Sequence, residues 1–228
     1  MKLQLIRSLQ DIRSQARSAV VVTDLDSGEQ RLLEPARSPE DALADAARDA
    51  IRADRSQAVE HGGRTYFLQV FNPPLRLVVI GAVHVAQALI PMARMAGYDV
   101  IVVDPRRTFA TAERFPDAAL DTRWPDEALQ ALAPDPRTAV VTLSHDPKID
   151  DPALRAALSS DVFYVGALGS RRTHAKRLDR LAGQGLSDAQ LERIHAPVGL
   201  DIGARSPAEI AISVMAEMTR VLRQVPAG

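Results

Sequence analysis

The chain has 228 residues, of which 46% are hydrophobic and 25% are charged, a composition typical of a globular protein with one large domain or two small ones. Its formal net charge of −1 at pH 7 argues against nucleic acid or an acidic membrane surface as its partner. The chain has no cysteine, which excludes disulfides, thiolate metal sites and cysteine nucleophiles. No apolar run is long enough to span a membrane, and the first residues lack the apolar centre of a secretory signal, so the sequence predicts a cytoplasmic protein.

Residues 1–72 are predicted to form a small α+β region. The periodicity predicts, in chain order, a helix over 1–17, strands over 19–23 and 30–33, a helix over 39–53, and strands over 57–60 and 64–71. The segment Asn72-Pro-Pro74 cannot continue a central strand and predicts a domain boundary. Because 72 residues are few for an independent core, this region is expected to pack on the larger domain as a structural or docking module.

Residues 75–228 are predicted to form the main domain, which begins with a βαβ unit. Leu75 to Ile80 is a Val/Ile-rich run typical of a strand that is buried on both faces of a parallel sheet. A helical pattern from Val83 to Met95 follows, and a second buried strand covers Val100 to Val103. The predicted fold class is therefore α/β: a Rossmann-like, doubly wound parallel sheet, preceded by the small α+β region.

The turn of this unit resembles a dinucleotide fingerprint, G-x-G-x-x-G/A, that lacks its middle glycine. Gly81 and Ala86 match the pattern, whereas Val83 places a side chain where a pyrophosphate approaches the backbone. Asp104 ends the second strand, where the fingerprint has its ribose-binding acid. On these residues alone, a nucleotide site and a plain βαβ unit are both open.

Later elements alternate between helix and strand. We expect a short helix over 108–115, an apolar step at 119–120, a helix over 125–132, a strand over 138–143, a helix over 151–158, a strand over 162–165, and helices from 170, over 187–194 and over 206–222. The last two helices are predicted to begin with capping boxes, Ser187 with Gln190 and Ser206 with Glu209.

Polar residues follow several of these strands, at the edge where open α/β sheets bind ligands. Arg106 and Arg107 follow Asp104 and suit either a phosphate or a solvated loop. His145 follows the strand over 138–143 and is either structural or part of a site.

A glycine-rich turn precedes the helix that starts near residue 170. Gly166 and Gly169 lie in this turn, and Ser170 and Arg171 open the helix, so backbone N–H groups and guanidinium groups converge there. The turn indicates either an anion site or an ordinary capped helix with a basic face. Asp201 lies in a later glycine-rich loop, between Leu and Ile.

Five stretches, IGAVHVAQAL, VVDPRRTFATAERFP, VTLSHDP, YVGALGSRRTHAKR and PVGLDIGARSPAEIAISVMAE, resemble in order the Rossmann domain of the XdhC/CoxF family. These are accessory proteins of molybdenum hydroxylases such as xanthine dehydrogenase and carbon monoxide dehydrogenase. The resemblance implies a protein that binds molybdenum cofactor, as molybdopterin or a nucleotide form of it, and assists its sulfuration and insertion. It also implies two partners: the apo-enzyme of a molybdenum hydroxylase and a sulfurtransferase.

On this resemblance and on position at strand ends, eleven residues are expected to line the cofactor site. They are Gly81, Val83, His84, Asp104, Arg106, His145, Gly166, Gly169, Ser170, Arg171 and Asp201. None is expected to make or break bonds, and no metal ligands are predicted. The chain departs from the family pattern at Val83, which stands in place of a glycine, and in lacking the family's N-terminal Ser-Gly-Gly-Cys-type motif.

Two other functions stay open on the sequence. Asp104 and the predicted fold favour an NAD(P)-dependent oxidoreductase, whereas the missing middle glycine and the lack of a recognisable acid–base pair disfavour it. Val83 favours a docking protein that has lost ligand binding and keeps only its surfaces for partner enzymes. Whether the protein is an enzyme, and whether it forms a homodimer, the sequence leaves open.

Overall fold

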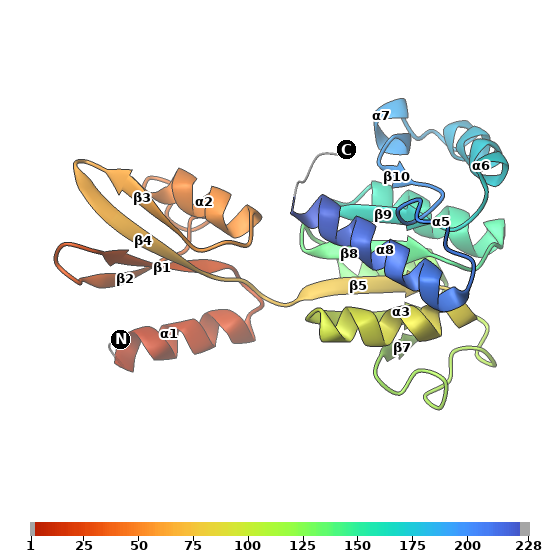
Figure 1. The fold of residues 1–228 in the computed structure, drawn as a ribbon, viewed down its shortest axis with the longest axis horizontal. Helices are drawn as coiled ribbons and strands as arrows, with labels where there is room; N and C mark the ends of the chain where they lie inside the picture. Colours follow the sequence, from red (N-terminus) through yellow and green to blue (C-terminus); the bar gives the residue numbers. More distant parts are fainter. Residues whose placement is uncertain (1–2, 224–228) are drawn as a thin grey trace. The chain divides into compact units, whose positions relative to one another are not determined.

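The chain divides into two compact units, residues 1–73 and residues 74–228. The structure, a computed structural model, describes residues 3–223. The adjacent prolines Pro73 and Pro74 form the junction between the units, where neither residue can donate a backbone hydrogen bond to a sheet. Each unit has its own sheet (Figure 1).

The first unit is a four-stranded antiparallel sheet with two helices. Its elements are α1 (Leu3–Ser14), β1 (Ala19–Asp24), β2 (Gln30–Leu33), α2 (Ala44–Arg52), β3 (Gln57–His61) and β4 (Arg64–Phe71), with the strand order β2-β1-β4-β3. Val20 and Val22 of β1 share one buried cluster with Ala47 and Ala50 of α2. Small residues on α2 therefore let this helix lie close to one face of the sheet.

The prediction of a helix over residues 39–53 was wrong at its start, because α2 begins at Ala44. The Asp41 carboxylate accepts two hydrogen bonds from Arg31, at 2.6 and 2.9 Å, and one from the Leu43 N–H at 2.9 Å. These contacts hold residues 41–43 in a turn. A contact with β2 thus moves the start of the helix beyond the position that Ser38 and Pro39 indicate locally.

The second unit is a six-stranded parallel sheet in the order β10-β9-β8-β5-β6-β7. Its strands are β5 (Leu75–Ile80), β6 (Tyr98–Val103), β7 (Ala119–Asp121), β8 (Thr138–Thr142), β9 (Tyr164–Ala167) and β10 (Ile194–His195). Its helices are α3 (His84–Met95), α4 (Pro125–Leu132), α5 (Pro147–Leu158), α6 (Arg171–Gly183), α7 (Asp188–Leu191) and α8 (Pro207–Leu222). The predicted α/β, Rossmann-like sheet is confirmed, and the direction of winding changes between β5 and β8.

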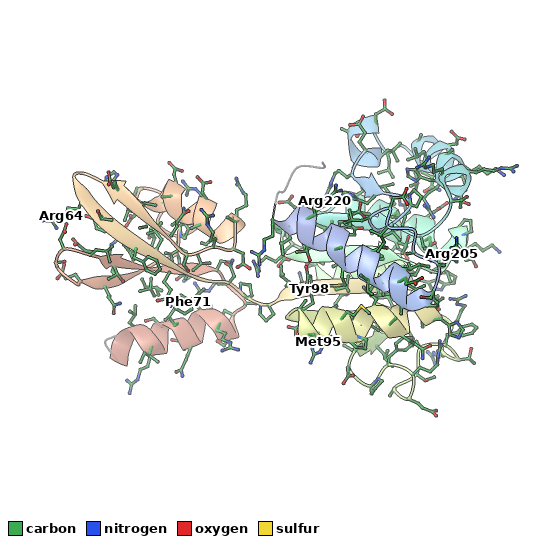
Figure 2. All side chains as sticks on the ribbon, in the orientation of Figure 1. Arg64, Phe71, Met95, Tyr98, Arg205 and Arg220 are labelled. Atoms are coloured by element: carbon green, nitrogen blue, oxygen red, sulfur yellow. The ribbon has the colours of Figure 1, made fainter. Side chains whose placement is uncertain are left out.

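Helices cover both faces of this sheet. Leu77 and Val79 of β5 belong to a buried cluster with α3 and α8, whereas Val78 and Ile80 belong to a second cluster with α4, α5 and α6. The alternation follows from the two-residue period of a strand. Helices α3 and α8 lie side by side (Figure 1), and Figure 2 marks α8 near its two ends by Arg205 and Arg220.

Both predicted capping boxes are confirmed, at Ser187 before α7 and at Ser206 before α8. The predicted helix over 108–115 was wrong, because these residues form successive turns. The predicted strand over 162–165 is shifted, since β9 runs from Tyr164 to Ala167. Helix α5 begins at Pro147 rather than at residue 151, because the Asp146 carboxylate caps it by accepting the Lys148 N–H at 2.9 Å.

Candidate functional site

The carboxyl ends of the parallel strands meet at one edge of the second sheet, and most of the predicted site residues follow those ends. Strands β6, β5, β8 and β9 are neighbours in that order, and the residues that follow them include Arg106, Gly81, His145 and Ser170. In open α/β sheets this edge, at the strand pair where the winding reverses, is where ligands bind. The β5–β8 pair is therefore the centre of the candidate site.

The turn from β5 to α3 requires glycine at position 81. Gly81 has φ +105°, and a Cβ placed on it would lie 2.9 Å from the Ser144 backbone nitrogen. Val83 then has an extended backbone, with φ −105° and ψ 175°, and occupies the N-cap position of α3. No side chain among residues 3–223 caps this helix. The amides of its first turn therefore have no side-chain partner in that range, at the positive end of the helix dipole, where His84 is exposed and Val85 and Ala86 are buried.

Asp104 is fully buried, with 0% of its surface exposed. Its Oδ2 accepts hydrogen bonds from the Ala82 N–H at 2.8 Å and from Arg106 Nη2 at 2.7 Å. Its Oδ1 accepts from the Arg106 N–H at 3.0 Å and from Arg106 Nε at 2.9 Å. Burial acts to raise the pKa of Asp104, but the hydrogen bonds from Arg106 and Ala82 outweigh it and lower the pKa below its ordinary value. Asp104 therefore holds the β5–α3 turn in place from the neighbouring strand.

The segment after β6 is fastened over the same turn by two arginines. The Arg106 guanidinium lies 4.7 Å from the centre of the Phe109 ring. Arg114 Nη1 donates to the Ala82 carbonyl oxygen at 3.0 Å and to the Phe109 carbonyl oxygen at 2.7 Å. These tertiary bonds explain why residues 108–115 form turns instead of the predicted helix. The sequence analysis missed Arg114, and the ERFP context gives no local signal for it.

The β9–α6 turn is built differently. Gly166 lies inside β9, and a Cβ on it would come within 2.6 Å of Val198 and 2.8 Å of Tyr164, so packing alone requires glycine there. Ser170 is the N-cap of α6, and its Oγ accepts the Thr173 N–H at 3.2 Å. Gly169, with φ +141°, precedes this cap. This helix start therefore uses one of its amides internally.

Arg171 and His145 are both exposed. Arg171 opens α6, directly after the Ser170 cap. His145 follows β8 with a left-handed backbone, φ +62°, and its side chain lines a pocket between α5 and α6. Both side chains are therefore free to meet a ligand at the edge where β8 and β9 end.

Asp201 is exposed, in the loop between β10 and α8. This loop is anchored by Glu217 of α8, whose carboxylate accepts from the Tyr164 hydroxyl at 2.6 Å and from the Gly199 N–H at 2.8 Å and lies 3.3 Å from His195 Nδ1. Burial acts to raise the pKa of Glu217, but its hydrogen bonds, those with His195 and Tyr164 foremost, outweigh it and lower the pKa. The sequence analysis missed Glu217, which interrupts the apolar stripe of the last helix.

The described part of the chain lacks two features, a metal-binding cluster and a membrane-spanning helix. Within residues 3–223, no group of three or more His, Asp or Glu side chains is arranged to hold a metal ion. No helix in the same range is both long and apolar enough to cross a membrane.

The family model of the XdhC Rossmann domain matches residues 77–218. The chain belongs to this family. The match begins in β5 and ends in α8, so it contains strands β6 to β10, the helices between them and all the turns described above.

Curated relatives agree with this membership. The molybdenum cofactor insertion chaperone PaoD of Escherichia coli is 36% identical over 151 residues, which cover 66% of this chain and 41% of PaoD. A probable xanthine dehydrogenase subunit of Bacillus subtilis is 34% identical over 160 residues, 70% of this chain and 46% of that protein. The chain thus spans less than half the length of these relatives.

A crystal structure of a xanthine dehydrogenase from Bacillus halodurans has a TM-score of 0.72 with this chain at 21% identity, and the match covers 98% of this chain and 65% of that one. At this identity the likeness concerns the fold, and it agrees with the Rossmann-like sheet of an XdhC domain.

Proposed function

We propose that this XdhC-family protein binds molybdenum cofactor at the carboxyl edge of its parallel sheet and assists its insertion into a molybdenum hydroxylase. The observation that carries the proposal is the N-terminus of α3, which no side chain in the described range caps and which follows a turn fixed by Asp104. The similarity to a protein named as a molybdenum cofactor insertion chaperone supports the choice of ligand.

The residues at this edge fit such a ligand chemically. Molybdenum cofactor is a pterin with a dithiolene and a phosphate, and therefore an anion. The uncapped start of α3 and the exposed His84 follow β5, and Arg171 opens α6 after β9, which is separated from β5 by β8 alone. In this proposal these groups bind and orient the phosphate and the pterin edge, while the cofactor carries the molybdenum chemistry for the recipient enzyme.

Asp104 and Arg106 support the site indirectly. Both carboxylate oxygens of Asp104 are occupied by Ala82 and Arg106, so the proposal gives Asp104 the task of positioning the turn. The alternative of an NAD(P)-dependent oxidoreductase relies on Asp104 as the ribose-binding acid. That alternative is weaker, because a buried, fully paired carboxylate has to break its bonds to Arg106 before it meets a ribose.

Two more specific parts of the proposal are supported by family membership alone. Sulfuration of the cofactor by a partner sulfurtransferase, and a nucleotide form of the cofactor as ligand, belong to the same hypothesis. The chain has no cysteine of its own, so in this proposal any sulfur-carrying cysteine belongs to a partner.

The test uses cofactor retention by three forms of the protein. Purified protein is mixed with molybdenum cofactor released from a molybdoenzyme and passed through a desalting column, and molybdenum and pterin are measured in the protein fraction. We expect retention by the wild type and by Val83→Ala. Val83→Thr keeps the shape of valine but adds a hydroxyl at the N-cap, which competes for the α3 amides, and we expect about fivefold weaker binding from a cap worth about 1 kcal/mol.

Failure of the wild type to retain molybdenum or pterin would contradict the proposal and favour a docking protein. NADPH retained in place of the cofactor in a parallel run would favour the oxidoreductase. Equal cofactor retention by Val83→Thr and Val83→Ala would show that the α3 amides do not contact the cofactor.

A further inference from the structure

A pocket of about 190 Å³ lies between α5 and α6, on the face of the sheet opposite α3 and α8. Its charged lining comes from both helices: Asp150 and Asp151 from α5, and Arg172, Lys176, Arg177 and Arg180 from α6. The four cations are spaced so that they occupy one face of α6. Neither the comparisons nor the proposed site at the β5–α3 turn accounts for this pocket.

The lining carries an excess of positive charge. Arg180 is neutralised by Asp151, to which it donates two hydrogen bonds at 2.6 and 2.9 Å. The other three cations face only one further carboxylate of the lining, that of Asp150. Asp150 also accepts a hydrogen bond from the Ser144 hydroxyl at 2.7 Å. An anion is therefore the ligand that balances this pocket.

Arg177 gives an independent sign of a missing ligand. It is 98% buried, since only 2% of its surface is exposed, and its Nη2 donates to the Leu168 carbonyl oxygen at 2.8 Å. Its Nε and Nη1 are buried and have no hydrogen-bond partner among the described residues. Burial lowers the pKa of Arg177, and the charges of Asp150 and Asp151 oppose this. A buried guanidinium with two unpartnered donor nitrogens is costly, so an acceptor in the pocket stabilises it.

We propose that the α5–α6 pocket binds a phosphate-class oxyanion, either inorganic phosphate or a phosphate monoester. Arg177 supplies donors from the buried wall, and Lys176 and Arg172 supply donors from the exposed side of α6. The inference is separable from cofactor binding at α3, because it rests on Arg172, Lys176 and Arg177 of α6, although His145, one of the residues expected at the cofactor site, also lines this pocket.

Equilibrium dialysis tests the proposal with two probes, inorganic phosphate and glycerol phosphate, at constant ionic strength. The wild type is expected to bind one equivalent of at least one probe in a saturable manner. Lys176→Ala is expected to weaken binding about tenfold, through loss of one charge-assisted donor. The matched control is Lys148→Ala, which removes an exposed lysine of α5 that does not line the pocket, and we expect it to change the affinity less than about twofold.

Arg177→Met is expected to abolish saturable binding, and circular dichroism checks that it folds; if it does not fold, the two lysine variants decide. Tighter binding of glycerol phosphate identifies an ester as the ligand, and tighter binding of phosphate identifies the free ion. Absence of saturable binding of both probes, or equal weakening by the two lysine variants, would overturn the proposal. Val83→Thr is expected to leave phosphate binding unchanged, so failure here and failure of the cofactor proposal are separable.

Discussion

The β5–α3 and β9–α6 turns both have a positive-φ glycine ahead of the N-cap, two residues before it in the first and one in the second, but they differ in how their helix starts are satisfied. Each has a glycine with positive φ, Gly81 or Gly169, followed by an extended N-cap residue, Val83 or Ser170. Ser170 caps its own helix, whereas Val83 has no group that can do so. The loop before α3 is instead supported by Asp104, which follows the neighbouring strand and accepts the Ala82 N–H. The comparison teaches that a turn can be rigid and still leave its helix amides open, if its support comes from elsewhere in the sheet.

The largest effect is expected from Gly81→Ala. The new Cβ would lie 2.9 Å from the Ser144 backbone nitrogen in a left-handed backbone, so we expect a loss of about 3–5 kcal/mol in the free energy of unfolding. The control is Gly97→Ala, where φ is +85° but no atom lies within 4 Å, and the expected loss is about 1 kcal/mol. Urea unfolding followed by the fluorescence of Trp124, the single tryptophan of the chain, reports on the second unit. Equal losses in the two variants would contradict the close approach to Ser144.

The next effect is expected from Asp104→Asn, which removes charge-assisted hydrogen bonds from Arg106 and Ala82 and costs about 2 kcal/mol at pH 7. The folded pKa of Asp104 is lowered, so its contribution is fully present above the unfolded pKa of about 3.9 and is lost as pH falls through the lower folded pKa. Urea midpoints of wild type and variant should therefore converge below about pH 4. Asp201→Asn, at an exposed position, serves as the control. If the difference in urea midpoint between wild type and Asp104→Asn did not change with pH, the charge of Asp104 would be unimportant for stability.

The smallest effect is expected from Ser170→Ala, which makes the start of α6 resemble that of α3. Loss of the bond from the Thr173 N–H is expected to cost about 1 kcal/mol. Ser159→Ala is the control, because the Ser159 hydroxyl only donates to the Arg155 carbonyl oxygen at the end of α5, and a change within about 0.5 kcal/mol is expected. The same Trp124 signal measures both. Equal stability of Ser170→Ala and wild type would mean that water caps α6 as well as serine does.

Features encoded by residues close in sequence were predictable. The capping boxes at Ser187 and Ser206 need only a partner three residues away, and both were found. The buried strands of the parallel sheet were found because they are nearly continuous apolar runs between glycine and proline signals. The positions of most candidate site residues followed directly, because parallel strands end at the same edge.

Features that depend on distant partners were not predictable from periodicity. Arg114 reaches back to Ala82 across 32 positions and turns an apparent helix into a series of turns. Arg31 binds Asp41 and delays the start of α2. In each case a tertiary hydrogen bond outweighed local helix propensity.

The α5–α6 pocket was not predicted: the sequence left the start of α6 open between an anion site and a capped helix with a basic face, and gave Arg177 no role. A signal was present: Arg177 and Leu181 are four residues apart and so share a helix face, and Leu181 is fully buried. An arginine on the apolar stripe of a helix is rare without a partner. The charge of Asp150, which opposes the effect of burial on Arg177, comes from another helix, and that proximity needed the fold.

The peptide groups around Ala82 are held from opposite sides, since Asp104 accepts the Ala82 N–H and Arg114 donates to the Ala82 carbonyl oxygen. The chain has therefore already lost, on folding, the conformational freedom that a loop loses when it closes around a ligand. A ligand that meets the α3 amides finds them preorganised. Its association is then limited by diffusion and desolvation, and no slow rearrangement of this turn is expected in stopped-flow traces.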